Sequence, residues 1–99
     1  MHVLVETLQG RWQQMFQALS NGEDLPPGRR LRAEGIAEAA VLVGAASEAE
    51  LDREMDSAYK AAFDRTLAEQ FGEDWRNFFP FPEIPAVSSR APVYPSTAD

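Results

Sequence analysis

The sequence contains no cysteine and a single histidine, His2, next to its first methionine. Without thiols there is neither a disulfide framework nor a thiolate metal site. A Cys-His or Ser-His catalytic pair has no well-placed histidine to draw on, and no nucleophile-elbow, phosphate-loop or dinucleotide-binding motif is present. The sequence therefore predicts a non-enzymatic protein with no metal or organic cofactor.

Long apolar runs are also absent. The longest is Gly35 to Ala46, in which Glu38 is the only charged or polar side chain. This run is too short for a bilayer, which needs roughly twenty apolar residues. The first residues have no basic flank, and Glu6 interrupts them before a signal-peptide core can form. We expect no membrane association and a cytoplasmic location.

Positive charge is scarce, with 9 Lys and Arg residues against 16 Asp and Glu and a net charge of −7. Such a chain repels phosphate backbones and anionic membranes, which disfavours nucleic acid as a partner. Arg29, Arg30 and Arg32 form one basic cluster, and the acidic residues beside it favour ordinary surface ion pairs over an anion site.

What the sequence does contain is helical periodicity. Apolar residues spaced by three and four predict a first helix over residues 5–19. A second helix is expected from about Pro26, capped by Asp24, to Gly44. Ser47 and Glu50 form a capping box that begins a third helix, which continues to Phe71 or breaks near Thr66 into a short fourth one. We predict an all-α fold, a small three-helix bundle.

The run from Gly35 to Ala46 is apolar almost all round, and such a helix has to be covered on more than one side. We therefore place the second helix at the centre of the bundle. Its exposed stripe is expected to carry Arg30, Glu34 and Glu38, which lie four residues apart.

A second copy of the chain is one way to cover this helix. In such a homodimer we expect Ile36 and Val43 at the interface. Val43→Asp is then predicted to dissociate or unfold the protein.

The composition changes after Gly72, where aromatic residues become dense and five of the seven prolines follow within residues 80–95. Proline at this density excludes a helix or a central strand. We divide the chain into a helical domain, residues 1–79, and an extended proline-rich tail, residues 80–99. The aromatic side chains either pack on the body of the protein or bind a partner, and they are Trp75, Phe78, Phe79, Phe81 and, within a proline-x-x-proline motif, Tyr94.

Residues 40–53 nearly match the spacing of a helix-turn-helix, with one residue too many in the turn. The helix that would read DNA opens with five carboxylates against Arg53 alone, so DNA would repel it. A solvated acidic face explains these carboxylates, since they favour the start of a helix. The face carries Glu48, Asp52 and Asp56, and an acidic protein that mimics DNA could use it against a nucleic-acid-binding partner.

The sequence thus favours a small interaction or regulatory protein that contacts another protein whose identity is unknown. Two alternatives stay open: a helix-turn-helix DNA-binding regulator, and an acidic DNA mimic that inhibits a nucleic-acid-binding protein.

Overall fold

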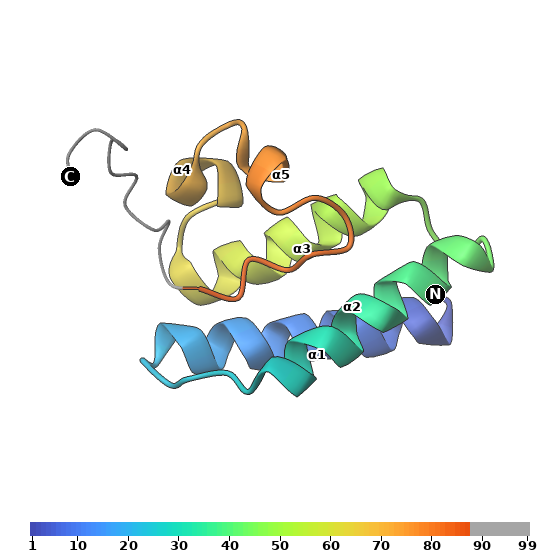
Figure 1. Ribbon diagram of the computed structural model, residues 1–99, viewed down its shortest axis with the longest axis horizontal. Coiled ribbons are helices and arrows are strands. Elements are labelled where there is room, and N and C mark those ends of the chain that lie inside the picture. Colours follow the sequence, from blue (N-terminus) through green and yellow to red (C-terminus); the bar gives the residue numbers. More distant parts are fainter. Residues whose placement is uncertain (88–99) are drawn as a thin grey trace, which may run out of the picture.

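A computed structural model describes residues 1–87, and within that range the protein is all-α (Figure 1). Its helices are α1 (Val3–Ser20), α2 (Pro27–Leu42), α3 (Glu48–Phe63), α4 (Leu67–Phe71) and α5 (Trp75–Phe78). The predicted small helical fold is confirmed. Of the two alternatives for the end of the third helix, the break near Thr66 into a short fourth helix is the one observed. A further single turn, α5, follows it.

Two capping boxes position α3 and α4. The Glu50 amide donates to the Ser47 hydroxyl at 3.1 Å, and the Ser47 amide donates to the Glu50 carboxylate at 3.0 Å. Thr66 and Glu69 repeat the pattern at 3.1 and 2.8 Å. Each box satisfies two amides that a helix start leaves without an intrahelical partner. The first box was predicted; the second explains why the long amphipathic stretch breaks where it does.

The core lies between α1 and α3. Trp12 and Phe16 from α1 and Tyr59 from α3 are buried, and the Tyr59 ring meets Phe16 edge-on at 5.2 Å between centroids. On its other side Tyr59 stacks on Phe63 at 4.4 Å. Large side chains bury more apolar area than small ones, so these two helices supply most of the core.

The predicted central position of α2 is wrong. Its buried residues are Ala33, Glu34, Ala37 and Ala40. Ile36 and Val41 are only half-buried against the core. Two leucines of α2 and the valine directly after it face solvent: Leu31 is 56%, Leu42 86% and Val43 60% exposed. A run of apolar residues reveals that a helix has apolar sides, but not how many of them its own chain covers. Val43 lies outside the core, so unfolding by Val43→Asp is no longer expected.

Two local expectations for α2 also fail. Pro26, rather than Asp24, occupies the N-cap position, and no side chain caps the helix. Glu34 was placed on the exposed stripe but is 7% exposed, because a segment fifty residues later covers it. Glu38 is exposed as expected.

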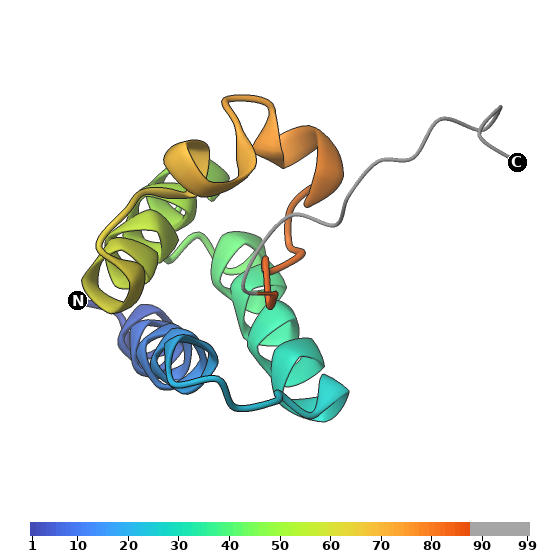
Figure 2. The ribbon, with the colours of Figure 1, turned by 90° about the vertical axis from the view of Figure 1, so that its left-hand side faces the viewer.

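Residues 72–87 form the C-terminal segment. Its first part, with α5, lies beside α4 and α3, and residues 80–87 then pass between α2 and α3, which diverge from their shared turn (Figures 1 and 2). Ile84 and Pro85 are buried, while Trp75, Phe79 and Phe81 pack partly buried against the core. The segment therefore closes the side of the bundle that α2 and α3 leave open. The division at residue 80 stays a prediction, since Tyr94 and the rest of residues 88–99 lie outside the described residues.

Candidate interaction surface

The acidic face of α3 is largely engaged by its own chain. Asp52 forms an ion pair with Arg76, and the Asp56 carboxylate accepts the Leu67 amide at 2.8 Å. Glu48 is exposed at the start of the helix. Two of the three carboxylates that we considered for a partner therefore hold residues 67–76 against α3.

Arg76 contacts several residues of the C-terminal segment, residues 72–87, and so links them to one another. Its Nη1 donates to the carbonyl oxygens of Phe79, at 2.6 Å, and Glu83, at 3.3 Å, and its guanidinium lies 4.4 Å from the Trp75 ring centroid. Burial lowers the pKa of Arg76 to about 10, and the charge of Glu48 opposes that shift. The guanidinium remains charged at neutral pH and stabilises this segment by charge-assisted hydrogen bonds.

Our sequence analysis missed Arg76. The available signal was that it is the only cationic residue between positions 66 and 89, inside the aromatic stretch. A cation beside aromatic rings and opposite an acidic helix is a recurrent pairing.

Glu34 makes the corresponding attachment to α2. Its Oε2 accepts the Ile84 amide at 3.0 Å and Arg30 Nη1 at 2.8 Å. A buried carboxylate is tolerated because both partners supply hydrogen bonds to it. The ends of the segment are thus attached to different helices, through Arg76 to α3 and through Glu34 to α2.

The aromatic side chains are mostly unavailable to a partner. Phe79 meets the buried Phe71 edge-on at 5.3 Å between centroids, and Trp75 and Phe81 are half-buried on the core. Phe78 is 47% exposed. In the described part of the chain, these residues therefore act mainly as cover for the bundle.

The outer side of α2 is different, and we name it the α2 face: Leu31, Gly35, Ala39, Leu42 and Val43. The first four lie at spacings of four, four and three, which places them on one side of a helix. All are exposed except Ala39, which is half-buried. The predicted interface residue Val43 belongs to this face, and Ile36 borders it half-buried against the core.

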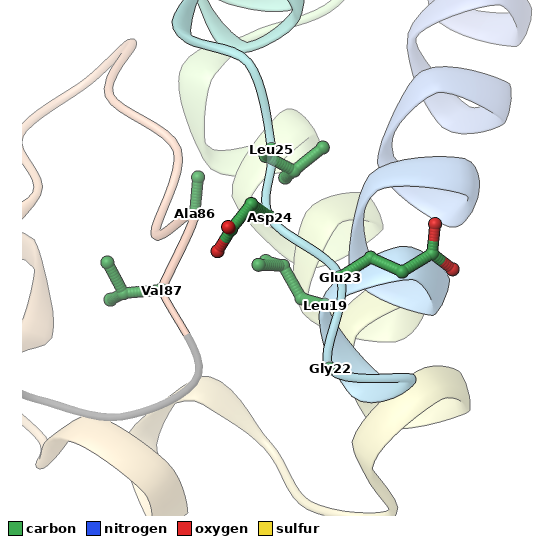
Figure 3. A pocket seen from close by; sticks show the side chains of 7 residues that line it. All are labelled: Leu19, Gly22, Glu23, Asp24, Leu25, Ala86 and Val87. Atoms are coloured by element: carbon green, nitrogen blue, oxygen red, sulfur yellow. The ribbon is translucent and has the colours of Figure 1, made fainter.

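A hollow of about 440 Å³ lies between the α1–α2 loop and residues 86–87 (Figure 3). Asp24 turns its carboxylate toward Ala86 and Val87, whereas Glu23 points away from them (Figure 3). The lining residues are Leu19, Gly22, Glu23, Asp24, Leu25, Ala86 and Val87. Asp24 is thus the only carboxylate of this lining that points inward, and one such group gives no support for acid–base chemistry here.

Among residues 1–87, no three potential metal-binding side chains lie close enough together to hold an ion. None of the helices in this part of the chain has both the length and the apolar character of a membrane span.

The α2 face is therefore the surface of the described residues that combines large exposed aliphatic side chains with no cover from its own chain. Comparisons with models of protein families, with curated proteins and with solved structures found no match to this protein.

Proposed function

We propose that this is a non-enzymatic interaction protein that binds another protein surface through the α2 face. The observation that supports the proposal is the exposure of Leu31 and Leu42 on α2 and of Val43 directly after it, at 56%, 86% and 60%. Exposed leucines scattered over a surface are normal. Aliphatic side chains grouped along one helix face are typical of helix packing against a partner.

The other candidate surfaces are largely in contact with the protein's own chain, which also supports the proposal. Asp52 and Asp56 contact residues of their own chain, which leaves less of an acidic face for a DNA mimic to present. The start of α3 still carries Glu48 and Glu50 in exposed positions, and such a helix is poorly suited to phosphate backbones. A cytoplasmic location stays a prediction from the sequence.

Photo-crosslinking in the cells that make the protein tests this proposal. Photoreactive benzoylphenylalanine replaces Leu42, and a matched variant carries it at Val3, another aliphatic position that is 66% exposed. We expect a discrete crosslinked species from position 42 that is absent or much weaker from position 3. No crosslink from position 42, or equal labelling from both positions, would contradict the proposal.

A further inference from the structure

We infer that the occupant of the α2 face is a second copy of this chain, bound with the two α2 helices antiparallel and crossing at Gly35. The inference rests on the proposed function and names its partner.

Gly35 lies in the interior of α2 and is exposed. Glycine weakens a helix interior relative to alanine. A Cβ added at this position would have no atom within 4 Å, so no contact within residues 1–87 requires a glycine here. A neighbouring helix that approaches closely at this point would require it, because small residues allow two backbones to come near each other.

The residues on either side of Gly35 are self-complementary. An antiparallel crossing at Gly35 places Leu31 level with Ala39 of the second copy, four residues to each side. It also places Leu42 level with Gly28 of the second copy, seven residues to each side. Large side chains on each helix therefore meet small residues on the other, twice each by symmetry. A two-fold interface has to match itself in this way.

The charges of α2 oppose its own helix dipole. No acidic residue lies in its first turn and no basic residue in its last turn, while Arg29 and Arg30 stand near its start. In α3 the order is the favourable one, with Glu48 and Glu50 in the first turn and Lys60 in the last. Negative charge stabilises a helix start and positive charge a helix end, so α2 is poorly stabilised alone.

Antiparallel pairing corrects this order. It brings the half of one α2 that carries Arg29 and Arg32 alongside the half of the other that carries Glu38. All three side chains are exposed, and none forms an ion pair within residues 1–87. The opposed dipoles of two antiparallel helices are also favourable. Charge complementarity therefore favours a second copy of this chain as the partner.

The absence of cysteine makes disulfide trapping a direct test. Single cysteines are introduced into the full chain as Gly35→Cys, Gly28→Cys and Gly10→Cys, and oxidised with copper phenanthroline in air. None of these three positions has an atom within 4 Å of an added Cβ, so each variant is expected to fold. Circular dichroism checks this before oxidation.

We expect Gly35→Cys to form a disulfide-linked dimer at least tenfold faster than the other two variants. Its two sulfurs meet at the crossing point, where the Cα separation suits a disulfide. Cysteines at position 28 would stand about 21 Å apart along an antiparallel pair. Gly10→Cys controls for random collision, since this residue lies on α1.

Equal rates for Gly35→Cys and Gly28→Cys would indicate a parallel pair and overturn the antiparallel arrangement. Equal rates for all three would overturn the second copy as occupant. So would a chain without substitutions that stays monomeric in sedimentation velocity at millimolar concentration. A crosslink from position 42 to a protein of another mass would do the same while leaving the proposed function intact. No crosslink from position 42 to any protein would contradict both the proposed function and the second copy as occupant.

Discussion

At the residue scale, Tyr59 is an unusual member of the core. It is fully buried between aromatic rings, and its hydroxyl has no hydrogen-bond partner in the described part of the chain. A buried hydroxyl without a partner costs about 1–3 kcal/mol relative to a satisfied one. Helical periodicity predicts that Tyr59 faces the core, but the missing partner depends on which side chains surround it.

Tyr59→Phe is therefore expected to raise the free energy of unfolding by about 1 kcal/mol, because the ring packing is kept and the unpaired hydroxyl is removed. Burial raises the pKa of Tyr59 to about 12 from its ordinary value of 10.0. The folded state thus favours the neutral phenol, and its contribution to stability is lost as pH rises from 10 toward 12. Urea unfolding at neutral and alkaline pH measures both effects. This account would be contradicted if Tyr59→Phe were less stable than the parent chain and lost the same stability as the parent between neutral and alkaline pH.

The carboxylates of the two capping boxes predict a loss of stability at acid pH, on the other side of neutrality from the effect of Tyr59. Hydrogen bonds from the backbone and the side chain of Ser47 and Thr66 hold the pKa of Glu50 and Glu69 below the ordinary 4.5. A lowered folded-state pKa gives stability that is present at neutral pH and is lost as pH falls through that pKa. The double variant Glu50→Gln/Glu69→Gln should lose less stability between neutral and acid pH than the parent chain.

Thermal unfolding across acid pH measures that slope. Glu23→Gln, in the exposed α1–α2 loop, is the control for loss of one carboxylate from the surface. The same acid slope in the parent chain and the double variant would show that the capping boxes do not contribute to it.

At the element scale, the C-terminal segment depends on two side chains from the helices that it joins. Glu34→Ala removes the acceptor of the buried Ile84 amide and leaves Arg30 without its carboxylate. We expect a loss of about 1–3 kcal/mol and faster amide exchange at Ile84 and its neighbours. Glu38→Ala, on the exposed side of the same helix, should change neither. Equal effects of the two substitutions would mean that Glu34 does not anchor the segment.

Gly35 gives a second test at this scale. In dilute solution, where the chain is monomeric, Gly35→Ala should stabilise the protein by about 0.5–1 kcal/mol, because alanine favours a helix interior and its Cβ meets no atom. Gly10→Ala is the matched change on α1. At high concentration the benefit at Gly35 should shrink or reverse, while the benefit at Gly10 persists. Identical behaviour at all concentrations would argue against close approach at Gly35.

The elements also show what sequence reasoning can reach. Spacing and the Ser47–Glu50 cap predict α1 and the start of α3, since these signals lie within a few neighbouring residues. They leave open whether α3 continues to Phe71 or breaks near Thr66. The burial of Glu34 depends on Ile84, fifty residues away, and the position of the acidic face depends on Arg76. Long-range pairings of this kind leave no periodic trace. The exposure of the α2 face has the same cause, because it is set by where the other elements pack.

At the scale of the whole molecule, α1, α3 and residues 72–87 form or cover the core, and within residues 1–87 only one side of α2 is covered. The outer side retains Leu42 and Val43, at 86% and 60% exposure. A surface of this kind is stabilised by burial against another protein. Our central claim is that this burial occurs in a symmetric pair of chains.

Sedimentation velocity of the full chain, from micromolar to millimolar concentration, tests the claim most directly. We predict a reversible shift from monomer to dimer that Leu42→Gln/Val43→Gln abolishes without altering the melting temperature of the monomer. Val3→Gln, at an exposed aliphatic position on α1, should leave the shift unchanged. A chain that stays monomeric at every concentration, or a dimer that survives the double substitution, would contradict the account.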